Sequence, residues 1–190
     1  MLILASASPR RRELMNMAGL SCECIPSNAE EVIPEGAAPE EIPAILAGQK
    51  AAAVFAAHPG DVVIGSDTVV EIEGRILGKP HTEAEAAEML RLLSGKTHLV
   101  HTGVCIVSEE KKKVFTSTTA VEFYPLTDGE IAAYVATKDP MDKAGAYGIQ
   151  GPGSYLVKGI TGDYYTVMGF PIAEVQRSLR YDFGISGGML

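Results

Sequence analysis

The chain has 190 residues, of which 46% are hydrophobic and 21% are charged, and this composition favours a globular protein with a sizeable core. No apolar run is long enough to cross a membrane and the N-terminus carries no secretory signal, so we expect a cytoplasmic protein. The formal net charge of −8 argues against general binding to nucleic acid or to acidic membranes, although an anion can still bind where cations are concentrated.

The cysteines and the overall organisation point to one reduced domain. The three cysteines, Cys22, Cys24 and Cys105, are an odd number and form no CxxC pair. Reduced structural thiols are therefore favoured over disulfides or a zinc site. Because the sequence shows no internal repeat, low-complexity segment or clear linker, we expect residues 1–190 to form one domain, with or without two lobes.

The first predicted elements are a short buried strand at residues 2–5 and a helix at residues 9–18. Ser8 suits the N-cap position and Pro9 the first helical position, where its missing N–H costs nothing. Arg10, Arg11 and Arg12 then fall in the first turn, where each positive charge opposes the helix dipole by roughly 0.3–1 kcal/mol. An anion bound there would remove this conflict, so the segment predicts a phosphate cradle. The alternative is a solvated basic turn.

A weaker set of candidates follows in residues 22–57. We expect a second strand at residues 22–26, an acidic loop that contains Glu30 and Glu31, and an Ala-rich helix at residues 45–57. Acidic pairs in loops are usually solvated, so these two glutamates are weak candidates for metal or catalytic work. Lys50 lies within the helix and is more often a surface lysine whose stem covers apolar atoms than a phosphate contact.

Asp67 is the carboxylate that the sequence singles out most clearly. A buried strand at residues 62–64 leads through Gly-Ser-Asp-Thr into a second β-rich segment at residues 69–72. β-Branched residues on both sides predict a rigid, partly buried backbone, where an acid needs a partner, a metal or a raised pKa. The alternative is an aspartate that bonds loop amides. A hairpin turn then leads to a strand at residues 75–77 and to Lys79, a better candidate than the lysine in the preceding helix.

The remaining chain continues the alternation of helices and strands. We expect a helix at residues 82–93, strands at residues 98–108 and 114–124, a helix at residues 127–137, a strand near residues 155–160 and a helix at residues 171–181. His98 and His101 lie three apart in a strand and so on opposite faces, which makes a shared metal site unfavourable. The whole pattern predicts an α/β protein with a mixed sheet.

Residues 139–153, with the sequence DPMDKAGAYGIQGPG, are the most unusual stretch. Four glycines are interleaved with Lys143 and Gln150, which favours a loop whose backbone approaches a ligand over an ordinary surface connection. In α/β sheets, ligands bind where loops at strand ends converge. We therefore expect a site formed by this loop and by the loops that follow residues 5, 64 and 77.

Five segments, in this order along the chain, together resemble the Maf family. They are SASPRRREL at residues 6–14, GSDTVV at 65–70, LGKP at 77–80, LSGKTH at 93–98 and DKAGAYGIQG at 142–151. The resemblance implies a cytoplasmic nucleoside triphosphate pyrophosphatase that cleaves between the α and β phosphates. It also implies a fold similar to the inosine-triphosphate pyrophosphatases, with a mixed twisted sheet, flanking helices, two lobes around a deep cleft, and usually a homodimer.

The same resemblance implies roles for particular residues. DKAGAYGIQG is similar to the branch that acts on dTTP and UTP, and not to the branch that acts on 7-methyl-GTP. The implied roles are catalysis for Asp67, substrate choice for Arg10, Thr68 and Gln150, and metal or phosphate binding for Ser8, Glu31, Lys50 and Lys79. Asp67 and Glu31 are expected to hold Mg²⁺ or Mn²⁺. Asp67 is expected to activate water, directly or through the metal.

Two departures from the family pattern and two alternative functions remain open. Ser66 stands where the family commonly has alanine, and Asn28-Ala29 before the acidic pair leaves open whether Glu30 or Glu31 faces the cleft. One alternative is a pyrophosphatase for modified purine triphosphates such as 7-methyl-GTP. The other is a nucleotide-binding regulator of cell division with negligible catalysis, a role associated with the family. Release of pyrophosphate from a nucleotide panel distinguishes these functions, with a small-molecule nucleotide as the expected partner in each.

Overall fold

A single mixed sheet runs through the protein, whose computed structural model describes residues 1–186. Within these residues the sheet has seven strands in the order β2-β1-β3-β5-β6-β7, and β4 pairs with β3 on the side of β1. The strands are β1 (Leu2–Leu4), β2 (Glu23–Cys24), β3 (Val62–Ile72), β4 (Arg75–Leu77), β5 (Thr97–Val107), β6 (Lys112–Phe123) and β7 (Val157–Thr161). β1 runs parallel to β2 and β3, and the other pairs are antiparallel, so the predicted mixed α/β sheet is confirmed.

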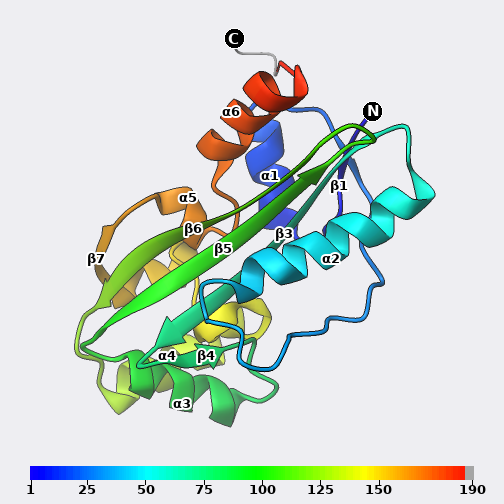
Figure 1. The fold of residues 1–190 in the computed structure, drawn as a ribbon. Coiled ribbons are helices and arrows are strands. Elements are labelled where there is room, and N and C mark those ends of the chain that lie inside the picture. The colour runs from blue at the N-terminus through cyan, green and yellow to red at the C-terminus, as the bar shows by residue number, and fades with distance from the viewer. Residues whose placement is uncertain (187–190) are drawn as a thin grey trace.

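Helices cover both faces of this sheet (Figure 1). One face carries α2 (Ile42–Ala57), and the opposite face carries α1 (Pro9–Met17) and α6 (Ile172–Phe183) at one end and α3 (Glu83–Leu93) and α4 (Asp128–Ala136) at the other. Short helical turns lie between them: η1 (Asp139–Asp142), η2 (Ala144–Ala146), η3 (Gly151–Leu156) and α5 (Tyr164–Val167). A capping box formed by Thr127 and Glu130 begins α4, which confirms the helix predicted there.

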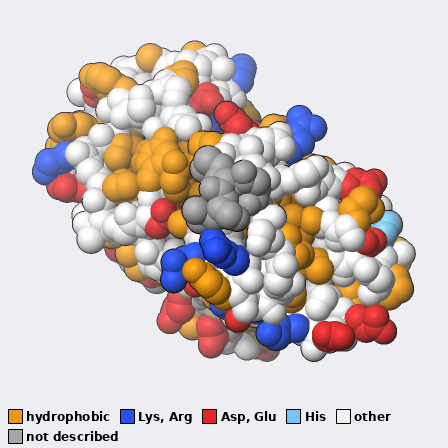
Figure 2. All heavy atoms as spheres, turned by 90° about the horizontal axis from the view of Figure 1, so that it is seen from above, with side chains coloured by type: hydrophobic (Ala, Val, Ile, Leu, Met, Phe, Trp, Pro, Cys, Tyr) orange, Lys and Arg blue, Asp and Glu red, His pale blue; other side chains and the backbone are white. Residues whose placement is uncertain are grey.

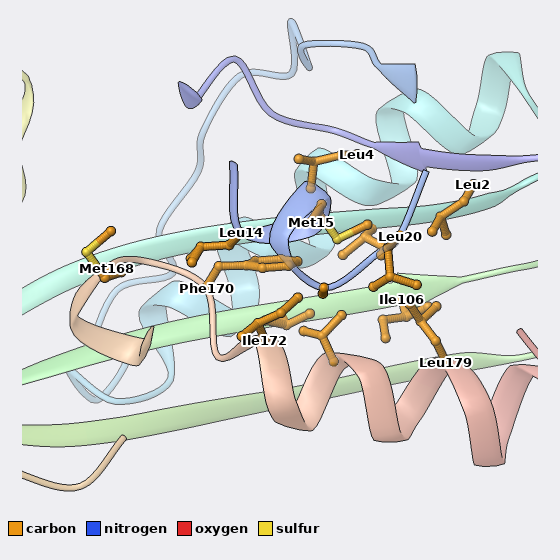
Figure 3. Close-up of a cluster of buried hydrophobic side chains, with 14 residues drawn as sticks. Leu2, Leu4, Leu14, Met15, Leu20, Ile106, Met168, Phe170, Ile172 and Leu179 are labelled. Atoms are coloured by element: carbon orange, nitrogen blue, oxygen red, sulfur yellow. The ribbon is translucent and has the colours of Figure 1, made fainter. Parts of the chain in front are cut away.

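The face opposite α2 holds two separate hydrophobic clusters. The first joins β1, α1 and α6 and includes Leu4, Met15, Phe170 and Leu179 (Figure 3). The second lies under α3 and α4 at the other end of the sheet. Burial of each such side chain stabilises the fold by roughly 1.5–3 kcal/mol. Between the two clusters the sheet carries hydroxyl side chains, so the two ends of this face are separated by a polar band.

Several predicted boundaries are wrong, and one error concerns the site. β3 is continuous from Val62 to Ile72, so Asp67 lies within a strand and not in a loop that follows residue 64. Gly65 and Ser66 resemble loop residues in sequence, but here Gly65 lets a helix pack closely on the strand. α2 begins at Ile42, three residues earlier than predicted, and β6 begins at Lys112. The predicted glycine-rich loop contains three 3₁₀ turns.

The cysteines, the helices and the surface charges can be compared with what the composition predicts. All three cysteines have free thiols. No helix in residues 1–186 is long and apolar enough to cross a membrane. The end of the molecule that carries α6 shows acidic and basic side chains interspersed with hydrophobic ones (Figure 2).

Candidate active site

The candidate site lies where one edge of β3 has no partner strand among the described residues. β1 pairs with β3 through Val62–Ile64, and β4 pairs with it only from Val70. Residues 65–69 therefore border open space, and a pocket of about 450 Å³ opens beside them. Asp67 and Thr68 are both in this segment, and successive strand residues point to opposite faces. Both side chains reach the same pocket, one from each side of the strand edge.

The pocket gathers most of the residues that the sequence nominated. Seven of the eight predicted site residues line it: Ser8, Arg10, Lys50, Asp67, Thr68, Lys79 and Gln150. The eighth, Glu31, is half-exposed, and its Oε1 lies 3.0 Å from the Nζ of Lys50. Segments far apart in the chain therefore meet around one cavity. The loop after residue 77 contributes Lys79, which is exposed and forms no ion pair within residues 1–186.

Two glycines explain how α2 reaches Asp67. A Cβ atom added at Gly65 would lie 2.2 Å from the carbonyl oxygen of Ala47, and one at Gly103 would lie 2.2 Å from the backbone of Pro43 and Ala44. The helix backbone thus packs directly on the sheet, with no side chain between them. Gly103 is the residue of β5 that pairs with Asp67. This close approach carries the next turn of α2, with Lys50, over the carboxylate.

Lys50 links the two candidate metal ligands. Its Nζ lies 2.5 Å from Oδ1 of Asp67 and 3.0 Å from Oε1 of Glu31. The Lys50 and Asp67 side chains are 17% and 14% exposed, so this ion pair is screened less by solvent than a surface pair. Of the acidic pair, Glu31 is the glutamate that forms an ion pair with Lys50. Lys50 is therefore no ordinary surface lysine.

Arg11 is the most firmly fixed cation in the pocket. Its Nε donates to the carbonyl of Gly169 at 2.8 Å, Nη1 to Oγ of Ser6 at 3.3 Å, and Nη2 to Oγ1 of Thr68 at 3.1 Å. Burial lowers the pKa of Arg11, while the nearby charge of Asp67 opposes this shift. An arginine keeps its charge in proteins, so Arg11 supplies a fixed positive charge at the pocket wall.

Arg10, the arginine named from the sequence, lies nearer the pocket mouth. Its Nη1 is 3.2 Å from Oδ2 of Asp142, a carboxylate of η1. Lys143 Nζ lies 2.7 Å from the other oxygen of Asp142 and 3.0 Å from Oδ1 of Asp139. Partial burial tends to raise the pKa of Asp142, but Lys143 and Arg10 outweigh it and lower that pKa. The start of α1 and the glycine-rich segment are thus joined across the pocket.

The glycine-rich segment is braced by its own hydrogen bonds. Tyr134 Oη donates to Asp139 at 2.6 Å and accepts the backbone N–H of Gly148 at 3.1 Å. Burial and the hydrogen bond to Asp139 raise the pKa of Tyr134. Tyr147 lines the pocket, and its Oη bonds Nε2 of the buried His98 at 2.7 Å. Gln150, by contrast, is exposed at the end of this braced segment.

The charges of the pocket favour an anion despite the acidic chain. Its lining includes five cationic side chains and three carboxylates. The cations are Arg10, Arg11, Lys50, Lys79 and Lys143, and the carboxylates are Asp67, Asp139 and Asp142. The cations outnumber the carboxylates, and an excess of positive charge in a cavity concentrates anionic ligands. Ser8 adds a hydroxyl at the start of α1, and within residues 1–186 this hydroxyl makes no helix-capping bond.

Comparison with known proteins identifies the family. The chain matches the family model described as Maf-like protein over residues 1–181. The chain belongs to this family. A dTTP/UTP pyrophosphatase from Bacillus mycoides is 55% identical over 179 residues, which is 94% of each chain. A dTTP/UTP pyrophosphatase from Bacillus velezensis is 52% identical over 179 residues, covering 94% of this chain and 95% of the relative.

The solved structures that resemble the chain are more distant. The Staphylococcus aureus Ham1 protein has a TM-score of 0.48 and 17% identity, over 64% of this chain and 71% of its own. A HAM1 protein from Coxiella burnetii has a TM-score of 0.42 and 18% identity, over 64% and 72%.

Sequence reasoning missed some residues of the site. Arg11 was noticed only as one of three arginines, because nothing local indicates which of them faces the pocket. Thr102, on β5, carries no local sequence signal, although it bonds Thr68 at 2.9 Å. The wall formed by Met168 and Gly169 was also missed. The only local indication there is that residue 169 is a glycine, which the structure places at φ +93°, a backbone angle that other residues rarely adopt.

Proposed function

We propose that the protein hydrolyses dTTP and UTP to the nucleoside monophosphate and pyrophosphate. The observation that carries this proposal is Asp67, placed at the open edge of β3 in a pocket with five cationic side chains. The names of relatives that are 52–55% identical over 94% of the chain support the choice of substrates. The electrostatics suit a triphosphate, because its charge exceeds what any one cation can neutralise.

The proposed chemistry needs a positioned water and a stabilised leaving group. Water attacks the α-phosphorus in line with the bridging oxygen, the α–β phosphoanhydride bond breaks, and pyrophosphate leaves with the electron pair. Asp67 accepts the proton of the attacking water. Lys50 holds the Asp67 carboxylate in place at 2.5 Å and presents its charge to the phosphates. Lys79 and Ser8, which also line the pocket, bind further phosphate oxygens.

The donor set also fits a divalent cation that binds together with the nucleotide. Asp67 and Glu31 offer carboxylate oxygens that both approach Lys50 Nζ, within 2.5 and 3.0 Å. No cluster of three or more His, Cys, Asp or Glu side chains able to hold a metal occurs in residues 1–186. Mg²⁺ commonly uses one or two carboxylates and completes its shell with water and phosphate oxygens. We therefore propose Asp67 and Glu31 as ligands of Mg²⁺ or Mn²⁺, which would neutralise phosphate charge when bound.

Base selection is assigned to other residues of the same pocket. We propose that Arg10, Thr68 and Gln150 select the substrate, as the family resemblance implies. Uracil and thymine present two carbonyl acceptors on either side of one N–H donor, and the amide of Gln150 can pair with such an edge. The braced backbone around Gly148 limits how far this part of the pocket can adapt. A buried polar edge without a partner costs about 1–3 kcal/mol, which is enough for selection.

We further propose one catalytic domain over residues 1–190, with two lobes that correspond to the two hydrophobic clusters. A cytoplasmic location is supported by three free thiols, which are typical of a reducing compartment. The homodimer and the absence of nucleic-acid or membrane partners remain predictions from the family resemblance and the net charge.

A nucleotide panel tests the proposed function directly. Purified protein is incubated with dTTP, UTP, CTP, GTP and 7-methyl-GTP, with Mg²⁺, with Mn²⁺ or with a chelator, and pyrophosphate is measured. We expect release from dTTP and UTP that depends on the divalent cation. Preferential release from 7-methyl-GTP would favour the purine alternative. Binding of dTTP without pyrophosphate release would favour a regulatory protein and would contradict the proposal.

A further inference from the structure

A row of hydroxyl groups crosses the sheet directly behind the pocket. Thr68 of β3 pairs with Thr102 of β5, and Thr102 pairs with Ser117 of β6, so the three side chains lie side by side on one face. This face is the one opposite α2, between the two hydrophobic clusters. Thr102 is fully buried, whereas Thr68 is partly exposed and lines the pocket. Such a buried row can transmit a fixed hydrogen-bond direction to the group at its end.

The proton of Thr102 has a definite destination. Its Oγ1 lies 2.8 Å from the carbonyl oxygen of Thr166, and a carbonyl only accepts, so Thr102 donates to it. A hydroxyl has one proton, so the 2.9 Å contact between Thr68 and Thr102 must then be donated by Thr68. If the Thr102 proton turned toward Thr68 instead, the bond to Thr166 would be lost. No new buried bond would replace it, because the contact between the two hydroxyls exists in both arrangements.

Arg11 also favours the arrangement in which Thr68 donates its proton to Thr102. Its Nη2 donates to Oγ1 of Thr68 at 3.1 Å and occupies one of the two lone pairs of that oxygen. The Thr68 proton is used by Thr102, and one lone pair remains. Arg11 itself is held by Gly169 and Ser6, so it keeps Thr68 in place. Toward the pocket, Thr68 can therefore accept a hydrogen bond but has no proton to donate.

We propose that Thr102 is a positioning residue that holds Thr68 as a hydrogen-bond acceptor and thereby selects pyrimidine bases with a ring N3–H. This inference rests on the proposed function. Uracil and thymine carry a proton on N3, whereas cytosine has a lone pair there. Thr68 can accept from the first two and opposes the third, because two acceptors would face each other. The selection against CTP thus depends on a residue that touches no ligand.

The test compares UTP with CTP in Thr102→Val, which has the same shape but no hydroxyl. Without Thr102 Oγ1, the Thr68 proton is free to turn toward the pocket and donate to cytosine N3. We expect the ratio of kcat/KM for UTP over CTP to fall at least about tenfold, since an unpaired buried polar group is worth roughly that factor. Thr102→Ser keeps the hydroxyl and should restore the ratio to within about threefold of the unmodified protein. Loss of activity on both nucleotides by one common factor would overturn the proposal.

Two further measurements keep the proposal testable. If Thr102→Val does not fold, Thr68→Val should lower kcat/KM for UTP at least about tenfold more than for CTP, and an equal loss would contradict the proposal. Titration with non-hydrolysable analogues of UTP and CTP measures the same ratio as a ratio of Kd values. A protein that binds the UTP analogue with this selectivity but releases no pyrophosphate would contradict the proposed function and still support the role of Thr102.

Discussion

The two faces of β3 differ sharply although their key residues, Asp67 and Thr68, are adjacent. On the α2 face, Lys50 forms ion pairs with both Asp67 and Glu31. On the other face, Thr68 accepts a hydrogen bond from Arg11 and joins a row of neutral hydroxyls that includes the fully buried Thr102. Charged, partly hydrated groups suit phosphate chemistry, whereas fixed neutral donors and acceptors suit recognition of a base. In the proposed function, one strand thereby presents one side chain for each task to a single pocket.

The largest expected effect on activity comes from removing the negative charge of Asp67. Asp67→Asn keeps the shape of the side chain but cannot accept the proton of water, so we expect kcat to fall at least ~100-fold, the usual scale for a general base. Steady-state pyrophosphate release measures this effect, and circular dichroism verifies the fold. Asp128→Asn is a matched control, since that carboxylate lies in an exposed pair with Arg91. Near-normal turnover by a folded Asp67→Asn protein would refute the catalytic role.

The contact between α2 and the sheet can be tested with two glycines. Gly65→Ala places a methyl group 2.2 Å from the Ala47 carbonyl, so we expect the free energy of unfolding to fall by about 2–3 kcal/mol. Gly48 lies in α2, next to Ala47, and a Cβ atom added there meets no described atom within 4 Å. Gly48→Ala should therefore stabilise the helix by up to ~1 kcal/mol. Urea denaturation compares both with the unmodified protein. Equal stabilities for the two variants would argue against direct contact between helix and sheet.

The stability of the protein should depend on acid through His98, which lies on the sheet face opposite α2. Burial lowers the pKa of His98 from 6.5 to about 4, so the unfolded chain takes up this proton at higher pH than the folded chain. The contribution of His98 to stability is therefore complete above about pH 6.5 and is lost as the pH falls toward 4. Between pH 7 and pH 5 we expect a loss of about 2 kcal/mol.

His98→Gln isolates this contribution because glutamine can bond Tyr147 but does not titrate in this range. Its unfolding free energy should fall by about 2 kcal/mol less than that of the unmodified protein over the same pH interval. An unaltered slope in His98→Gln would mean that the buried imidazole does not titrate as expected.

A smaller effect on activity is expected when the positive charge of Lys50 is removed. Lys50→Met keeps most of the side-chain volume but deletes the charge between Asp67 and Glu31, so we expect kcat/KM for UTP to fall about tenfold. Lys158→Met removes an exposed ion pair with Glu122 and should have no measurable effect on activity. If both variants behaved alike, Lys50 would be a structural residue only.

Local sequence predicted the fold and most of the candidate pocket, because the relevant patterns are local. β-Branched residues around Asp67 predicted its rigid backbone, and the interleaved glycines predicted the segment that carries Gln150. The close packing of α2 on Gly65 could not be predicted, since a glycine before a serine also fits a loop. The contact of Lys50 with Asp67 could not be predicted either. Whether a lysine in a helix faces solvent or a carboxylate depends on how the helix packs on the sheet.

Local sequence also does not indicate which of the three arginines at residues 10–12 faces the pocket. Arg11 faces inward because the carbonyl of Gly169, 158 positions away, accepts its Nε–H. Arg10 lies at the mouth because Asp142, 132 positions away, pairs with it. These partners are set by tertiary packing. Only the family resemblance, and not the local pattern, could assign a role to Arg10.

The ion pair between Arg10 and Asp142 also bears on how the pocket responds to ionic strength. In the free protein, Arg10, Lys50 and Lys143 are already neutralised by carboxylates of the same chain. In the proposed function, a triphosphate competes with these internal counter-ions for the cations, so part of its binding is an exchange of ionic partners. Added salt weakens both the pairs that are broken and those that form. The affinity for nucleotide should therefore depend on salt less steeply than five pocket cations alone would suggest.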